Sequence, residues 1–352
     1  MLISIVIPTF NRGAELKATL GALLASDPNG LEAIEIIVVD DGSTVPASDI
    51  VKTFEVVPPF ELRSLRQANA GPASARNSGF RSSRGQIVLF VDDDIISGPD
   101  LVRKHVAAHR KRPGSVIFGR YPLLPPTPET PLYKYVISLG NDLGENAQDE
   151  FIESPMVASG HLSVERQMFA DRGTVYAGNL ATPAAEEFEL SYRLREQGIP
   201  VFLATRIVAT HNRAVDLDTI CRQQHTYGLG CAEVWEKCPE TRQLPELRRI
   251  VHPRRDRSFR RCVMGLTPLR NTASAYATPR RLLLRAVQFL EAWAPIPRML
   301  PLFYRVTISL HFSSGIQRGL KLFSRDSAST TAARQKKFGG SEHRSQPISS
   351  SE

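Results

Sequence analysis

Cysteine is scarce in this chain, and the few cysteines present show no paired spacing. The 352 residues include four cysteines, and no two of them form a Cys-x-x-Cys motif. Neither a zinc site nor a disulfide framework is therefore predicted, and a reducing cytoplasm is the location that this pattern favours. The four positions are Cys221, Cys231, Cys238 and Cys262.

Long apolar runs are also absent. No uninterrupted apolar stretch reaches the ~18 residues that a helix needs to span a bilayer. The first apolar run begins at residue 3, which leaves no room for the charged and apolar regions of a signal peptide, so none is expected. The sequence thus predicts a protein that does not cross the membrane.

Positive charge is in excess, at a formal +8 at pH 7. Between residues 282 and 305 basic residues alternate with leucines and aromatic residues. This suits either an interfacial helix on an anionic cytoplasmic leaflet or a helical subdomain packed on the core. Nucleic-acid binding is not predicted, because no recognised motif accompanies the charge. A cluster of arginines precedes this segment, at Arg248, Arg249, Arg254, Arg255, Arg257, Arg260 and Arg261.

Three consecutive carboxylates, Asp92, Asp93 and Asp94, follow the apolar run 87–91. Taken alone, such a triplet suits a solvated turn after a buried strand. Crowded carboxylates repel one another, however, and a hard divalent cation would disperse their charge. The triplet is therefore a candidate metal site.

The segments before the triplet predict an α/β fold. A β-branched run over 3–7 stops at Pro8, a helical pattern covers 14–24, and a second apolar run over 34–39 ends in Asp40 and Asp41. A second helix is predicted around 73–82, ahead of the strand that carries the triplet. This βαβαβ order brings the acidic strand ends to one edge of a mostly parallel sheet, where such folds bind ligands.

These motifs together resemble the family-2 glycosyltransferases over roughly residues 3 to 213, much more specifically than any one motif would. The resemblance implies a GT-A fold, a Rossmann-like, mixed but mostly parallel sheet flanked by helices, followed here by a C-terminal helical extension. It implies donor contacts from the first loop, from Asp41 to a uracil or thymine base, and from Arg76. The first-loop residues are Pro8, Thr9, Phe10, Asn11 and Arg12.

The resemblance also places the triplet at the family's DxD motif and implies Mn²⁺ or Mg²⁺ as cofactor. Asp94 is the predicted metal ligand, because Mg²⁺ takes only one or two protein carboxylates. Asp92 is predicted to contact the donor ribose or the metal through water, and Asp93 to contact the donor or to face solvent. His211 either completes the metal shell, as in some relatives, or is a surface histidine at a strand end.

The catalytic base is predicted in the acidic segment Glu186-Glu187-Phe188-Glu189-Leu190. It resembles the family's Glu-Asp-x-Glu/Asp-Leu motif, whose Asp is the base, so Glu187 aligns with the base and Glu186 is the reserve candidate. An acidic first helical turn that complements the helix dipole is the other reading. Gly160 and His161 resemble an acceptor-binding stretch, although His161 could equally be structural.

The chain is thus predicted to be a metal-dependent, inverting glycosyltransferase that uses a UDP- or dTDP-sugar, non-processive because it lacks a Gln-x-x-Arg-Trp motif. The acceptor is predicted to be a saccharide or lipid-linked saccharide of the cell surface, met at the inner face of the plasma membrane. A catalytically silent nucleotide-sugar-binding protein is one alternative; a sugar nucleotidyltransferase is less favoured. The predicted regions are a catalytic domain over 1–213, a basic helical extension over 214–323, and a disordered tail over 324–352.

Overall fold

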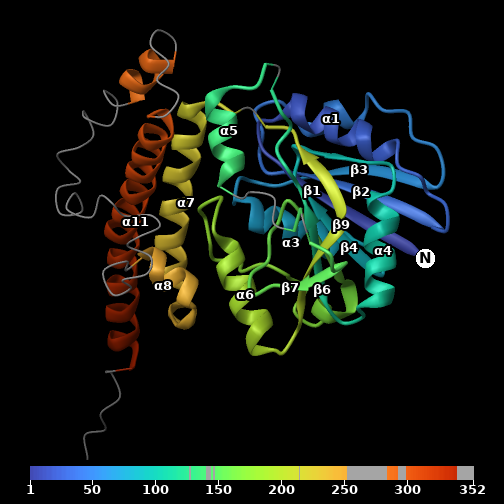
Figure 1. The fold of residues 1–352 in the computed structure, drawn as a ribbon. Coiled ribbons are helices and arrows are strands. Elements are labelled where there is room, and N and C mark those ends of the chain that lie inside the picture. The colour runs from blue at the N-terminus through green and yellow to red at the C-terminus, as the bar shows by residue number, and fades with distance from the viewer. Residues whose placement is uncertain are drawn as a thin grey trace, which may run out of the picture.

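The computed structural model describes residues 1–126, 128–139, 144–145, 147–213, 215–251, 284–291 and 299–338, with side chains up to residue 324 in the last range. A twisted sheet forms the centre of the catalytic region, and long helices stand beside it (Figure 1). In the described residues the sheet has nine strands in the order β3-β2-β1-β4-β8-β6-β9-β5, with β7 also paired to β9.

The strands are mixed in direction. β1, β2, β3 and β4 run parallel to their neighbours among themselves, whereas β8 is antiparallel to both β4 and β6. β9 runs parallel to β6 and antiparallel to β5 and β7. The bounds are β1 Leu2–Thr9, β2 Ala33–Asp40, β3 Phe60–Arg66, β4 Ile87–Val91, β5 Ile95–Ser97, β6 Val116–Arg120, β7 Phe151–Glu153, β8 His161–Glu165 and β9 Val201–His211.

Helices cover both faces of the sheet, and the C-terminal helices stand beside it. Short 3₁₀ helices lie at Arg166–Phe169 and Pro239–Gln243, and residues 284–291 are also helical. The α-helix bounds are α1 Gly13–Leu24, α2 Ala47–Val51, α3 Pro72–Ser82, α4 Leu101–Lys111, α5 Pro131–Ser138, α6 Glu186–Glu196, α7 Leu217–Lys237, α8 Pro245–Val251 and α11 Leu300–Phe338.

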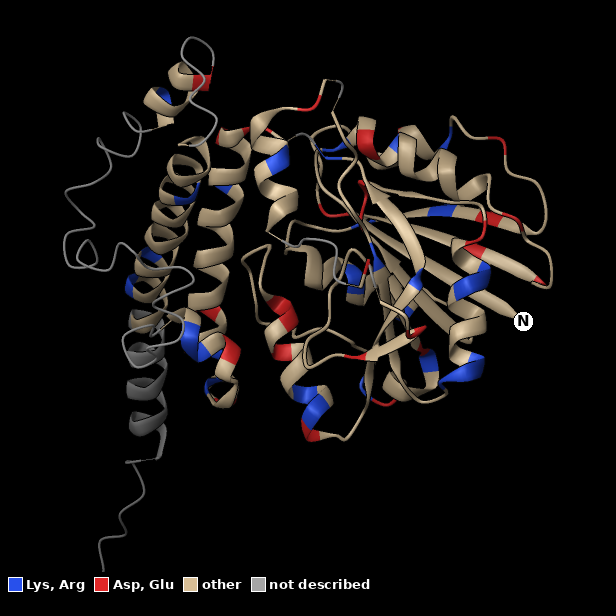
Figure 2. Ribbon diagram, viewed as in Figure 1, with Lys and Arg blue, Asp and Glu red and all other residues tan. Residues whose placement is uncertain are grey.

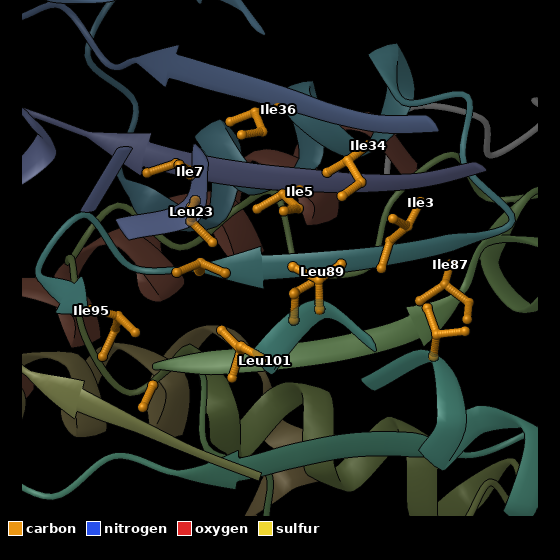
Figure 3. Packing of buried hydrophobic residues seen from close by; sticks show 14 of the residues in the cluster. Ile3, Ile5, Ile7, Leu23, Ile34, Ile36, Ile87, Leu89, Ile95 and Leu101 are labelled. Carbon is orange, nitrogen blue, oxygen red and sulfur yellow. The ribbon is translucent and has the colours of Figure 1, made fainter. Parts of the chain in front are cut away.

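Strand β1 is buried on both faces, which explains its continuous β-branched run. Ile3, Ile5 and Ile7 point to the face covered by α1 and α4, where they meet Leu20 and Val102. Figure 3 shows this packing from close by. Because side chains alternate along a strand, Val6 points to the opposite face, which α3 and α6 cover.

The α/β fold and the C-terminal helices agree with the sequence prediction, but the strand count does not. An additional helix, α2, and an additional strand, β3, lie between the second and third predicted strands. β3 pairs only with β2 in the described sheet, and its residues are mostly half-buried. Its weak apolar signal is what an edge strand is expected to show, so the βαβαβ reading was one unit short.

The C-terminal prediction is also corrected. Helix α11 continues to Phe338, beyond residue 324, where the disordered tail was predicted to begin. Residues 320–338 contain no glycine or proline, so the backbone can continue as a helix. The tail from 339 onward, five of the seven arginines of the cluster, and residues 282–283 and 292–298 of the alternating segment lie outside the described residues.

In the part of the chain that the structure covers, none of the helices is both long enough and apolar enough to cross a bilayer. Helices α7 and α11 lie side by side (Figure 1) and approach closely through glycines. A Cβ atom on Gly228 would collide with the Phe312 carbonyl oxygen, and one on Gly315 with the His225 carbonyl oxygen. These glycines therefore allow a closer helix contact than larger residues would.

Candidate active site

A cleft of about 660 Å³ opens at the carboxyl ends of β1, β2 and β4. The loops after these strands meet the start of α6 and one face of α7 there. The predicted residues that line the cleft are Pro8, Thr9, Phe10, Arg12, Asp41, Arg76, Asp92, Asp93, Asp94, Glu186, Glu187 and His211. Three predicted residues, Asn11, Gly160 and His161, do not line it.

The first loop divides its residues between two roles. Phe10 is 45% exposed and presents its ring at the cleft. Asn11 has a positive φ of 55°, and its side-chain oxygen accepts a hydrogen bond from the Thr44 backbone N–H at 2.8 Å. Asn11 therefore joins the loops after β1 and β2 and leaves the cleft lining to its neighbours.

Asp41 is a buried acceptor at the end of β2. One of its carboxylate oxygens accepts from the Ala70 N–H at 2.9 Å and from Gln67 Nε2 at 2.7 Å, and the other accepts from the Gly71 N–H at 2.9 Å. Asp41 thus organises the segment that leads into α3. It also lines the cleft, and its Oδ2 atom, which accepts only from Gly71, has a further lone pair.

The acidic triplet is distributed differently from the prediction that Asp93 could face solvent. Asp93 is only 4% exposed, and its oxygens accept from Thr9 Oγ1 and from Arg12 Nη1, each at 2.8 Å. Burial raises the pKa of Asp93 to about 7, against the opposing effects of Arg12 and Thr9. Asp93 therefore does not face solvent, and its two hydrogen bonds tie the triplet to the first loop.

Asp94 carries the cationic partners. Its Oδ2 atom lies 2.7 Å from Arg12 Nη2 and 3.1 Å from His211 Nε2. Burial acts to raise the pKa of Asp94, but His211 and Arg12 outweigh it and lower that pKa to about 2. Asp94 is thus ionised at neutral pH, as a metal ligand must be.

Arg76 joins the acidic triplet to the start of α6. Its Nη2 atom donates to Asp92 Oδ1, and its Nη1 atom donates to Glu186 Oε1, both at 2.6 Å. The guanidinium also lies over the Tyr176 ring, 5.2 Å from its centroid. Because Arg76 itself is buried, it locks two acidic segments that are about ninety residues apart in sequence into one site.

The two glutamates at the start of α6 have different surroundings. Glu186 is buried and bound to Arg76, whereas the half-buried Glu187 accepts one hydrogen bond, from Ser159 Oγ at 2.6 Å. Burial, with Glu186 nearby, raises the pKa of Glu187 to about 7 despite the Ser159 hydrogen bond. Oε2 of each glutamate is buried without a hydrogen-bond partner in the described structure.

Backbone strain positions this pair of glutamates. Ala185 precedes them with φ 69° and ψ 8°, a left-handed conformation that alanine rarely adopts. Acidic residues occupy the first turn of α6 and arginines the last, so charge complements the helix dipole, as the red and blue ends of α6 show in Figure 2. The dipole reading and a site at Glu187 are therefore compatible.

His161 has a place inside the protein that excludes the implied acceptor contact. It is fully buried, and its Nε2 and Nδ1 atoms lie 2.9 Å from the Arg120 carbonyl oxygen and 3.0 Å from His105 Nε2. Both ring nitrogens are thus occupied by the protein. The backbone of its neighbour Gly160 accepts from the Asp92 N–H at 2.9 Å, so this pair supports the triplet from beneath.

The chain of buried histidines continues through Ser163 to His109. Ser163 Oγ lies 2.8 Å from His105 Nδ1 and 2.8 Å from His109 Nε2. Burial lowers the pKa of all three rings and keeps them neutral. Because the Arg120 carbonyl can only accept, His161 Nε2 donates to it, and His105 Nε2 then donates to His161 Nδ1. Ser163 Oγ donates to His105 Nδ1 at 2.8 Å in preference to the Ile117 carbonyl at 3.4 Å, and it accepts from His109 Nε2, which leaves His109 Nδ1 unprotonated.

Several residues that line the cleft were not predicted from the sequence. Ser159, Arg213, Gln223 and Tyr227 all face it. Arg222 lines the cleft as well and pairs with Asp218. An i, i+4 spacing of Gln223 and Tyr227 on one helix is the only sequence signal that these last two share.

A divalent ion fits the chemistry of the side chains around Asp94. Asp92 and Asp94 offer carboxylate oxygens and His211 an imidazole nitrogen, a mixture that suits Mn²⁺. Among the described residues, no three His, Cys, Asp or Glu side chains come together as a metal cluster. A site with one or two protein ligands, completed by phosphate and water, is the usual arrangement for Mg²⁺.

The fold defines the class of protein. The structure is similar to that of a mannosyltransferase from Pyrobaculum calidifontis in complex with GDP-Man and Mn²⁺, with a TM-score of 0.53 and 14% sequence identity. The similarity covers 88% of this chain and 86% of that one. The fold is therefore that of the GT-A glycosyltransferases, as predicted.

The family follows from the sequence comparisons. Residues 4–170 match the model of glycosyl transferase family 2. Validoxylamine A glucosyltransferase of Streptomyces hygroscopicus subsp. jinggangensis is 30% identical over 275 residues, which are 70% of this chain and 63% of that protein. Minor teichoic acid biosynthesis protein GgaA of Bacillus subtilis is 32% identical over 95 residues, 26% of this chain and 21% of that protein.

Residues 4–170 form a domain of glycosyl transferase family 2, which confirms the resemblance seen in the motifs. The chain spans less than two thirds of the length of the two validoxylamine A glucosyltransferases that it matches, namely 63% and 58%.

Proposed function

We propose that this protein is a metal-dependent, inverting glycosyltransferase that moves a sugar from a nucleoside-diphosphate sugar to a hydroxyl group. The observation that carries the proposal is the bridge through Arg76, which holds the acidic triplet and the Glu186-Glu187 pair in one cleft. Glu187, whose carboxylate has a free oxygen, lies in this cleft and supplies the base. The ionised Asp94 lies in the same cleft and supplies the site for the leaving group.

Glu187 is the proposed general base. Ser159 holds its Oε1 atom, and the buried Oε2 atom has no partner. Oε2 takes the proton of the acceptor hydroxyl as that oxygen attacks the anomeric carbon. The bond from this carbon to the diphosphate oxygen breaks in the same displacement, so the configuration inverts and the nucleoside diphosphate leaves with the bonding electrons.

The leaving diphosphate needs positive charge. Asp94, joined by Asp92 or by His211, would hold Mn²⁺ or Mg²⁺, which would neutralise negative charge on the phosphate oxygens. Arg213 lines the same end of the cleft, and burial together with the nearby Arg12 lowers its pKa despite the opposing charge of Asp94. An added anion near Arg213 would relieve this unfavourable burial, as a diphosphate can.

A loop residue indicates which nucleotide the donor sugar carries, and the basic cluster indicates where the acceptor is met. Asp41 is the proposed acceptor for the N–H of a uracil or thymine base, which favours a UDP- or dTDP-sugar. A saccharide or lipid-linked saccharide of the cell surface is the proposed acceptor. Arg248 and Arg249 on α8 are the described part of the basic cluster that would face an anionic inner leaflet.

Thermal unfolding in the presence of a panel of nucleoside diphosphates and nucleotide sugars, with and without Mn²⁺, tests the donor site, because a ligand of the folded state raises apparent stability. We expect a shift that requires both Mn²⁺ and a uridine or thymidine nucleotide. Asp94→Ala is expected to abolish this shift, and the matched control Asp49→Ala, at an exposed position on α2, to retain it. A metal-independent shift, or an undiminished one in Asp94→Ala, would contradict the proposed metal site.

Turnover of the nucleotide sugar selected by this panel tests the base. Glu187→Gln is expected to retain the donor-induced shift but to lose at least 10²-fold in turnover, the usual contribution of general base catalysis. Near-normal turnover would move the role to Glu186. Donor binding without transfer or hydrolysis in the unaltered protein would instead support a catalytically silent nucleotide-sugar-binding protein.

A further inference from the structure

One face of α7 forms the wall of the cleft next to Glu187. Gln223 and Tyr227 lie four residues apart on this helix, and both line the cleft. Gly230 follows three residues later, where a Cβ atom would collide with the Ala184 carbonyl oxygen. This contact brings α7 close to the segment that carries Glu186 and Glu187, and Figure 1 shows α7 between α11 and the sheet region.

Two buried acceptor atoms at this wall have no partner in the described structure. They are Gln223 Oε1 and Glu187 Oε2, both on residues that line the cleft. A buried acceptor left without a hydrogen bond is unfavourable, because it has lost its contact with water. A ligand that presents several hydroxyl donors would satisfy both atoms, and one of those hydroxyls would lie at the proposed base.

Tyr227 adds an aromatic surface to the same wall. Its ring stacks on Phe312 of α11 with a centroid distance of 6.2 Å and an interplanar angle of 28°, and it lies 6.4 Å from the Phe188 ring. Burial raises the pKa of Tyr227, and the charges of Glu187 and Glu186 add to this effect, which places its phenol near the glutamates. Aromatic faces with a few fixed polar groups are typical of small-ligand sites.

The charges near this wall disfavour an anionic ligand. Glu186 and Glu187 contribute two carboxyl groups, while the nearby guanidinium of Arg76 is taken by Asp92 and Glu186. Arg222, next to Gln223 on α7, pairs with Asp218. A ligand phosphate at this wall would thus face two carboxyl groups beside arginines that are already paired, because Arg213, which also lines the cleft, lies near Asp94.

We propose that the α7 face formed by Gln223 and Tyr227 is the acceptor subsite, and that it takes a neutral polyhydroxylated ring, a sugar or cyclitol, instead of a phosphorylated one. Gln223 Oε1 accepts one ring hydroxyl, Tyr227 packs on the ring, and a second hydroxyl meets Glu187. The inference rests on the proposed function, because it needs a donor in the adjoining half of the cleft.

The test measures release of nucleoside diphosphate from the nucleotide sugar selected by the stability panel, with Mn²⁺ and one added acceptor probe. The probes are methyl α-glucoside, myo-inositol and glucose 6-phosphate at millimolar concentrations. We expect the neutral probes to accelerate release at least fivefold over water alone, and glucose 6-phosphate to do so much less.

Two substitutions at Gln223 locate the subsite. Gln223→Ala and the similarly sized Gln223→Met, which both remove the acceptor oxygen, are expected to raise the half-saturating concentration of the neutral probe about tenfold, equivalent to about 1.4 kcal/mol. The midpoint of the donor titration, followed by thermal unfolding, is expected to stay in place. Gln197→Ala, at an exposed position outside the cleft, is the control and should match the unaltered protein. If Gln223→Ala fails to fold, Gln223→Met decides.

The proposal is overturned if only glucose 6-phosphate accelerates release, if no probe does, or if both Gln223 variants keep the original half-saturation. It is also overturned if these variants shift the donor midpoint as much as the acceptor value. Loss of donor binding in the unaltered protein would instead refute the proposed function, so the two failures are distinguishable.

Discussion

Acidification should destabilise this protein through its buried histidine chain, well before most carboxyl groups titrate. Burial lowers the pKa of His109 and of His161 to about 4, and that of His105 well below its ordinary value. In the unfolded chain, histidine titrates near pH 6.5, so below this pH the unfolded state binds more protons. Stability is therefore expected to fall from about pH 6.5 down to about pH 4.

The size of the effect follows from the two values. For one histidine with a pKa of about 4 when folded and about 6.5 when unfolded, the free energy of unfolding at pH 5 is lower by about 2 kcal/mol than at pH 8. His109 and His161 together thus account for about 4 kcal/mol, a large share of the stability of a typical domain. Glu165 Oε1 lies 3.8 Å from His109 Nδ1 and favours the protonated ring. Burial outweighs this effect and still lowers the pKa of His109 to about 4.

Urea unfolding at a series of pH values between 4.5 and 8 measures this effect, and His109→Gln isolates it. Glutamine can donate to Ser163 as His109 Nε2 does, but it does not titrate. Near pH 5 the variant should lose about 1.2 kcal/mol per pH unit from the slope of stability against pH, since His109 contributes almost one proton there. Arg110→Gln, at the exposed neighbouring position, should leave the slope unchanged.

Coincident slopes for His109→Gln and the unaltered protein would refute the neutral histidine chain. They would mean that His109 carries the same charge in the folded and unfolded states near pH 5. The directions assigned to the chain of hydrogen bonds that starts at His109 and ends with His161 on the Arg120 carbonyl would then also be wrong.

Three other predictions concern the site. Turnover should rise with pH through a midpoint near 7 as Glu187 ionises, and Glu186→Gln should move the midpoint down, because a neighbouring negative charge is removed. Arg76→Ala should cost about 3–5 kcal/mol in urea unfolding by leaving Asp92 and Glu186 without their partner; a loss below ~1 kcal/mol would contradict the bridge. Ala185→Gly should stabilise the fold by about 1 kcal/mol if the left-handed backbone is strained, and a loss would count against it.

The central strands and the acidic edge were predictable because their signals are local. The β-branched run 3–7 and the apolar run 87–91 are buried on both faces, so nearly every residue in them is apolar. Each parallel strand ends at the same edge, and the motifs that follow them therefore converge whatever the loops do. β3 escaped prediction because an edge strand has a weaker apolar pattern.

Sequence alone predicted the triplet, Arg76 and the paired glutamates as site residues, since each lies in a family motif near the start or the end of a predicted element. Only the tertiary structure decided which side chain each polar group meets. It bound Asp93 to Arg12, buried His161 among histidines from another element, and put Gln223 on the lining of the same cleft as Glu187. Such pairings join residues tens to over a hundred positions apart, and they depend on packing distances that no local pattern encodes.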